Sequence, residues 1–188
     1  MKLTKIISIL GWSCIIAGLT LSFYAKYFAE EQKEEIRTEI KDTYYKSKQC
    51  LKELLYFESR NTSIKEREAI LDVTLNRYKH KNYPSTICEV VQQDKQYSYR
   101  NNLQDKSQII LPEFQSINSI LDQKAYLEIE EIVDNRFQSG NILPNKVLPE
   151  NALWYHTKQV KPIWRKSKKI KQIVVDKTFK HKYYLDIK

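Results

Sequence analysis

Residues 51–62 read LKELLYFESRNT, an apolar helical stretch that ends at Glu58 and passes at once into a polar turn. The Glu58 carboxyl therefore lies between aromatic side chains and the mouth of the turn, where it is partly desolvated. Desolvation raises the pKa of a carboxyl and lets it hold a proton near neutral pH. A general acid acting on a glycosidic bond needs such a carboxyl. The alternative is a solvated glutamate at a helix end, since the chain has 23 acidic residues.

The overall charge indicates an anionic partner. The chain has 188 residues, enough for one domain with a core and an appendage, and its formal net charge is +9. Residues 158–188 contain eleven Lys or Arg but only two acids, Asp176 and Asp186. Nucleic acid, an acidic glycan, a cell-wall polymer and a membrane surface are the candidate partners.

The N-terminal segment predicts a membrane anchor. Residues 6–25 are uncharged over twenty positions, about the length of a helix that crosses a bilayer core. Lys2 and Lys5 precede this segment, whereas Lys26 is followed by four glutamates between residues 30 and 35. This asymmetry predicts a single-pass protein held in the inner membrane, with a cytoplasmic N-terminus and an extracytoplasmic body. A cleaved signal peptide is the alternative, but small residues do not occupy both cleavage positions at the expected exits.

Hydrophobic periodicity predicts three parts: an anchor over residues 1–29, a charged stalk helix over 30–44 and a globular domain over 45–188. The fold class is α+β and mainly helical. In the domain, the pattern predicts helices over 45–58, 63–79, 86–92 and 116–139, and extended segments over 152–157, 170–175 and 179–185. Asn61 or Thr62 is the expected N-cap of the second of these helices, and Gly140-Asn141 the expected end of the last.

Cysteine and histidine usage bounds the chemistry. Cys14 lies in the predicted anchor, which leaves Cys50 and Cys88 either to pair or to remain as two core thiols. Neither cysteine has metal-site spacing, and the three histidines are scattered over a hundred residues. We therefore expect no metal and no cofactor.

Seven short sequence blocks between residues 55 and 184 resemble blocks of one known family. In order they are 55–60 LYFESR, 69–77 AILDVTLNR, 83–91 YPSTICEVV, 96–98 QYS, 152–157 ALWYHT, 162–164 PIW and 181–184 HKYY. Their order and spacing are similar to those of the cell-wall hydrolases typified by the spore-cortex-lytic SleB and CwlJ proteins. The resemblance covers roughly residues 50–184, with a divergent insertion around 100–150.

The resemblance implies a lysozyme-like fold that cleaves the glycan strands of peptidoglycan. It places the catalytic glutamate at Glu58, the family's Asn-Arg pair at Asn76 and Arg77, and its aromatic-Ser pair at Tyr97 and Ser98. The chain departs from the family after the glutamate, where residues 61–63 replace the usual glycines.

The remaining candidates are substrate-binding residues, each with a structural alternative. Tyr97 and Tyr99 alternate as aromatics suited to stacking on sugar faces, or they belong to the core. The full set of substrate-binding candidates is Arg60, Asn76, Tyr97, Ser98, Tyr99, His156, His181 and Tyr183.

The fate of the sugar after protonation separates two mechanisms. A hydrolase uses a second carboxylate, whereas a lytic transglycosylase lets the same glutamate deprotonate the C6 hydroxyl of the sugar, giving an anhydro product. Glu66, Glu68 and Asp72 are the nearest acids in sequence, and their positions suit a solvated helix surface. The pattern therefore favours the lytic transglycosylase over the muramidase.

Two other classes compete with the enzyme. A nucleic-acid binder would explain the charge, but the predicted extracytoplasmic topology argues against it. A catalytically inactive, membrane-anchored wall-binding or scaffold protein is the second rival. The enzyme itself would serve either as a phage endolysin or in bacterial wall remodelling, and the sequence leaves the oligomeric state open.

Overall fold

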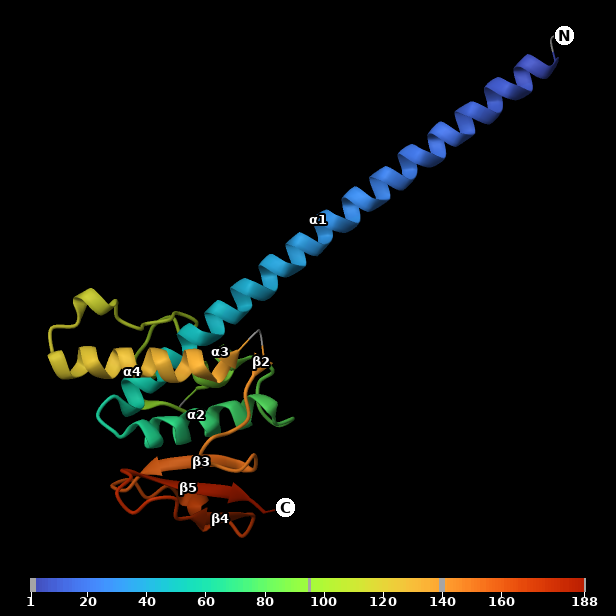
Figure 1. Cartoon of the computed structure of the whole chain (residues 1–188). Coiled ribbons are helices and arrows are strands. Elements are labelled where there is room, and N and C mark those ends of the chain that lie inside the picture. The colour runs from blue at the N-terminus through green and yellow to red at the C-terminus, as the bar shows by residue number, and fades with distance from the viewer. Residues whose placement is uncertain (1–2, 95, 139–140, 188) are drawn as a thin grey trace. The chain divides into compact units, whose positions relative to one another are not determined.

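The structure, a computed structural model, describes residues 3–94, 96–138 and 141–187, and side chains from residue 21 onward except that of residue 22. The chain divides into two compact units, Met1–Thr43 and Tyr44–Lys188. Helix α1 (Leu3–Ser59) runs through the first unit and into the second (Figure 1). The predicted stalk is helical, and it carries exposed Glu30–Lys33 and Glu34–Arg37 ion pairs, each at 3.3 Å.

The predicted anchor falls mostly on residues whose side chains lie outside the described part. Residues 6–25 overlap residues 1–20, for which only the helical backbone from residue 3 is described. Within the described residues, no helix has both the length and the apolar character needed to cross a membrane.

Two short-range caps define the helices that follow α1. Helix α2 (Ile64–Lys79) begins after Ser63, whose hydroxyl accepts from the Glu66 backbone N–H at 3.3 Å. The expected N-cap at Asn61 or Thr62 is therefore wrong by one or two residues. Helix α3 (Ile87–Gln92) begins after Thr86, which accepts from the Glu89 N–H at 3.2 Å. Both caps satisfy donors that the first helical turn leaves unpaired.

The last helix is shorter than its periodicity predicts. Helix α4 (Ile120–Arg136) follows a 3-10 turn at Phe114–Ser116, and it ends where Phe137 turns extended. Strand β1 (Phe137–Gln138) pairs there with β2 (Asn141–Ile142), so a hairpin replaces the last predicted turn. The expected cap at Gly140 lies outside the described residues.

A three-stranded antiparallel sheet closes the domain. Its strands β3 (Ala152–Thr157), β4 (Ile170–Ile173) and β5 (His181–Asp186) are arranged in the order β3-β5-β4. Helix α2 lies between this sheet and α4 and packs against β3 (Figure 1). Two further 3-10 turns are Ser98–Arg100 and Ile163–Lys166. The predicted α+β, mainly helical class is confirmed.

A disulfide fastens the end of α1 to α3. Cys50 and Cys88 are both buried and bonded, with their Cα atoms 5.4 Å apart. This resolves the two alternatives that the sequence left open. The bond joins residues 38 apart in sequence, next to the core formed by Leu51, Leu54 and Leu55. The disulfide therefore attaches α1 to α3 about two turns before Glu58.

Candidate active site

Glu58 lies in the last turn of α1, and its side chain is half-buried. Burial raises its pKa from 4.5 to about 7, because the low-dielectric surroundings disfavour the charged form. The Tyr155 hydroxyl interacts with the carboxylate and lowers the pKa in opposition to burial. Among the described residues, Glu58 forms no ion pair. A carboxyl with these properties exchanges a proton readily at neutral pH.

The turn after Glu58 is held by a buried arginine. Arg67 donates from Nε to the Ser59 carbonyl at 3.1 Å and from a terminal nitrogen to the Arg60 carbonyl at 2.6 Å. Its other terminal nitrogen pairs with Glu128 of α4 at 2.6 Å. These bonds satisfy carbonyls left unpaired at the helix end. Arg67 therefore fixes the direction in which α1 ends and with it the Glu58 side chain.

Tyrosines from two distant segments face Glu58. Tyr155 of β3 and Tyr97, before the first 3-10 turn, both have a raised pKa, and the Glu58 charge contributes to each shift after burial. The Tyr97 hydroxyl accepts from Arg77 at 3.3 Å. The buried Tyr155 hydroxyl forms no hydrogen bond of ordinary geometry with any described residue. It is therefore available to the Glu58 carboxyl or to a bound ligand.

The inner face of the sheet supports Tyr155. Tyr155 is the register partner of Tyr183 on β5, and its ring meets that of His181 edge-on at 5.3 Å. His181 Nδ1 lies 2.8 Å from Glu66 Oε1, which also accepts the His181 backbone N–H at 2.8 Å. Burial lowers the His181 pKa although Glu66 opposes the shift. The site is thus backed by an imidazole that stays neutral at pH 7.

Two acids expected on a solvated helix surface are buried. Glu66 is bonded to His181 as described, and Asp72 pairs with Arg136 at 2.5 Å while accepting backbone N–H groups of residues 146–148. Glu68 is half-buried and pairs with Lys146 at 3.1 Å. The solvated-surface expectation is wrong for Glu66 and Asp72, because α2 lies between two layers and buries both sides.

The Asn-Arg pair of α2 holds the chain that leads into β3. The Asn76 side-chain amide donates to the carbonyls of Pro149 and Ala152 at 2.9 and 3.0 Å. Arg77 Nε donates to the Leu153 carbonyl at 2.8 Å. Both side chains are buried. This geometry supports a positioning role, because the two residues fix the strand that carries Tyr155.

The other predicted binding residues are dispersed. Arg60 pairs with Asp122 at 3.3 Å, and Ser98 is exposed. Tyr99 stacks on Phe57 with ring centroids 4.8 Å apart. His156 points to the outer face of the sheet, where Nε2 lies 2.8 Å from the Tyr184 hydroxyl. The structure therefore groups Tyr97, His181 and Tyr183 around the Glu58–Tyr155 pair, and it places Arg60, Ser98, Tyr99 and His156 elsewhere.

Sequence reasoning missed Tyr155 and Glu66. Tyr155 stands inside the quoted 152–157 block, and strand alternation puts it on the face opposite Trp154 and His156. That alternation was a usable signal for Tyr155. No local pattern marks Glu66, because its partner lies 115 residues away. No group of three His, Cys, Asp or Glu suited to a metal ion occurs in the described part of the chain.

Comparison with known proteins identifies the family of the domain. The sequence model of the family described as Cell Wall Hydrolase matches residues 61–184, about two thirds of the chain, beginning just after Glu58. No curated protein and no solved structure matches the chain. The matched range contains Tyr97, Tyr155, His181 and the strands that position them. The chain therefore belongs to the cell wall hydrolase family, whose substrate is peptidoglycan.

Proposed function

We propose that the protein cleaves the glycan strands of peptidoglycan with Glu58 as general acid and base. The main support for this proposal is the half-buried Glu58, whose pKa of about 7 leaves it partly protonated at neutral pH. The protonated form would donate to the bridging oxygen between two sugars. The end of a helix followed directly by a second helix is also how lysozyme-like domains present their acid, by analogy of fold.

The surroundings of Glu58 favour a lytic transglycosylase over a muramidase. A nucleophilic carboxylate in a retaining glycosidase lies about 5 Å from the acid, and its charge would raise the pKa of that acid further. The Glu58 pKa is raised by burial, and no second carboxylate contributes to the shift. Glu53, Glu66 and Asp72 each bind their own donors. After its proton is donated, Glu58 would accept the proton of the C6 hydroxyl, and the ring closes as the anhydro sugar.

The proposed setting is the extracytoplasmic side of the inner membrane, with the N-terminal segment as a single-pass anchor. The uncharged residues 6–25 and their basic N-terminal flank support this topology. The Cys50–Cys88 disulfide suits an oxidising compartment. The same chemistry serves cell lysis by a phage endolysin or remodelling of the wall.

A zymogram of the full chain on purified peptidoglycan tests the proposal. We expect clearing by the wild type and by Glu150→Gln, which removes an exposed carboxyl, but none by Glu58→Gln. Unchanged clearing by Glu58→Gln would remove Glu58 from the mechanism. No clearing by any variant, together with binding to the wall, would favour an inactive wall-binding protein. Mass spectrometry of the released fragments then distinguishes anhydro ends from reducing ends.

A further inference from the structure

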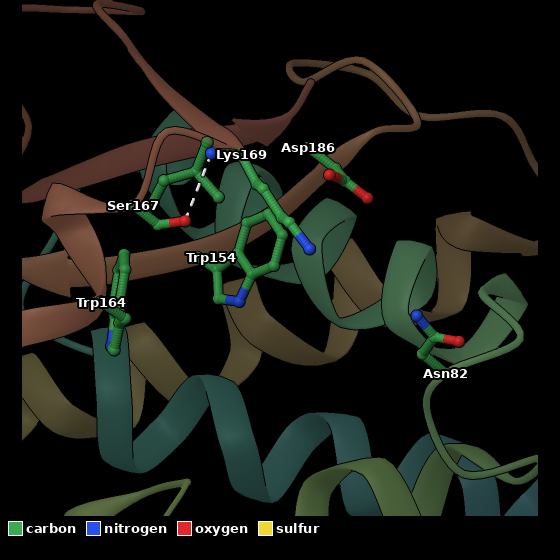
Figure 2. A pocket seen from close by; sticks show the side chains of 7 residues that line it. Asn82, Trp154, Trp164, Ser167, Lys169 and Asp186 are labelled. Carbon is green, nitrogen blue, oxygen red and sulfur yellow. Dashed lines mark hydrogen bonds between the residues drawn. The ribbon is translucent and has the colours of Figure 1, made fainter. Parts of the chain in front are cut away.

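A pocket of about 330 Å³ lies on the outer face of the sheet. Figure 2 shows the indoles of Trp154 and Trp164 on one side of the pocket, with Asp186 and Asn82 on the other. Residues Ser167, Lys169 and Ile170 complete the lining. Ligand pockets begin at about 300 Å³, so this one has the size for a single small ring with its substituents.

The pocket is separate from the Glu58 site. Neighbouring residues of a strand point to opposite faces of its sheet, and Tyr155 faces Glu58 while Trp154 faces the pocket. The register repeats this division across the sheet, since Trp154 pairs with Tyr184 and Tyr155 with Tyr183. A ligand in the pocket would therefore be bound by a different surface from the one that carries the acid.

The aromatic wall of the pocket is rigid. Trp164 meets Tyr184 edge-on at 5.2 Å and His156 at 5.6 Å, and His156 stacks on Tyr184 at 5.4 Å. These contacts hold the Trp164 ring although 37% of the residue is exposed. Because the ring is held before a ligand arrives, little conformational entropy is lost on binding.

The polar groups of the pocket have mixed chemistry. Asn82 offers an amide, Ser167 a hydroxyl, Asp186 a carboxylate and Lys169 an ammonium. In the described chain, neither Lys169 nor Asp186 forms a side-chain ion pair. Exposed basic residues flank the lining residues in sequence, at Arg165, Lys166 and Lys168. Together with Lys169 in the lining, these charges favour an anionic ligand.

We propose that this pocket is a non-catalytic subsite for one acidic, N-acetylated sugar at a peptide-free position of the glycan strand, where the carboxylate is not bound in an amide to a stem peptide. The proposal rests on the proposed function, since it takes its ligand from the same polymer. An apolar ring face would pack on the indoles, the acetamido group and hydroxyls would bond with Asn82, Ser167 and Asp186, and the carboxylate would pair with Lys169. The subsite would hold a strand to the domain independently of the bond being cleaved.

Tryptophan fluorescence tests the subsite in the full chain. Two of the three tryptophans line the pocket, and the third is Trp12, so a Trp12→Phe, Glu58→Gln background reports the pocket without turnover. The probes are the N-acetylglucosamine–N-acetylmuramic acid disaccharide and, as a neutral comparison, the N-acetylglucosamine disaccharide. We expect a saturable emission change with tighter binding of the acidic probe.

Matched substitutions locate the binding. We expect Lys169→Gln to weaken the acidic probe about 3-fold, the scale of an exposed ion pair, and to leave the neutral probe unchanged. The neighbouring Lys168→Gln, which lies outside the pocket lining, should change neither probe. We expect Trp164→Ala to weaken both probes about 10-fold through loss of the aromatic wall.

Three results would overturn the subsite. They are no saturable emission change, equal affinity for the two probes, and equal effects of Lys168→Gln and Lys169→Gln. Each leaves clearing of peptidoglycan by the wild type intact. Failure of the proposed function would instead appear as loss of clearing by the wild type, which the fluorescence titration does not measure.

Discussion

Two glutamates of α1, five residues apart, are held in opposite ways. Glu53 is fully buried, and its carboxylate accepts from the Arg100 guanidinium, from the Tyr99 hydroxyl at 3.1 Å and from the Ile110 N–H at 2.7 Å. Glu58 is half-buried, and among the described residues the Tyr155 hydroxyl is the one group whose hydrogen bond lowers its pKa. The Glu53 carboxylate is thus paired with donors that compensate its charge, whereas the Glu58 carboxylate, about one turn later, has no compensating cation among the described residues.

The difference lies in the groups that surround each carboxyl. Three donors bind the Glu53 carboxylate, and its partner Arg100 also holds the insertion in place, since that guanidinium donates to the carbonyls of Lys106 and Gln108. Removing the buried Glu53 carboxylate would leave the Arg100 charge uncompensated. Glu58 lacks such compensation, so its charged form costs stability, and the same property makes it a candidate for proton transfer.

Replacing Glu58 should have the largest effect on activity. Glu58→Gln removes the only proton carrier that the proposed mechanism uses, and we expect clearing of peptidoglycan to slow by about 10³-fold. Turbidity loss of a peptidoglycan suspension measures the rate, and Glu150→Gln is the exposed control. A variant within a few-fold of the wild type would assign the acid elsewhere.

Replacing Glu53 should have the largest effect on stability. Glu53→Gln leaves the buried Arg100 without its counter-charge, and we expect the free energy of unfolding to fall by about 4 kcal/mol. Urea unfolding followed by tyrosine and tryptophan emission measures it. The activity per folded molecule should persist at low temperature. A loss of activity without a loss of stability would contradict the structural role of Glu53.

Replacing Glu58 should also change how the stability of the domain depends on pH. The folded pKa of Glu58 is raised, so the folded state binds a proton more tightly than the unfolded chain does, and wild-type stability falls as pH rises from 4.5 through about 7. Glu58→Gln should therefore be more stable than the wild type at pH 8, by about 3 kcal/mol, and equal to it below pH 4.5. Thermal unfolding at the two pH values measures this. If Glu58→Gln were less stable than the wild type at pH 8, the inference that the Glu58 charge is uncompensated would be wrong.

The smallest expected effect is that of Tyr155. The Tyr155 hydroxyl lowers the Glu58 pKa, so Tyr155→Phe should raise that pKa further and move the alkaline limb of the pH–rate profile to higher pH. Clearing rates between pH 5 and pH 9 measure the shift. Tyr184→Phe is the matched control, because Tyr184 lies on the face of the sheet opposite to Tyr155. This variant should leave the pH–rate profile unchanged. If the alkaline limb of the pH–rate profile did not move in Tyr155→Phe, Tyr155 would have no influence on the Glu58 pKa.

Local patterns predicted most of the helices and the desolvated setting of Glu58. The apolar run before Glu58 indicated both the helix end and a desolvated carboxyl, and Glu58 has the raised pKa expected there. Helix α2 and strand β3 follow the predicted 63–79 and 152–157 to within one residue. Periodicity predicts these elements because one face of each is buried against a neighbour.

The errors arose where distant contacts override local preference. Helix α4 ends at Arg136 because Phe137 pairs with Ile142, which periodicity over 116–139 does not reveal. The burial of Glu66 and Asp72 follows from the sheet and α4 packing on two sides of α2. Whether Cys50 and Cys88 pair also depends on their distance in space, so cysteine count alone left it open.

The sequence by itself determined the family blocks, the order of the main elements and the place of Glu58 at the end of an apolar helical run, because each of these is encoded within a few neighbouring residues. Only the tertiary structure decided which carboxyl is neutralised and which is not. Glu53, Glu66 and Asp72 find donors 46 to 115 residues away, whereas Glu58 has the Tyr155 hydroxyl but no cationic partner among the described residues. Burial raises the Glu58 pKa, and burial depends on segments distant in sequence, so the fold that surrounds this carboxyl sets its chemistry.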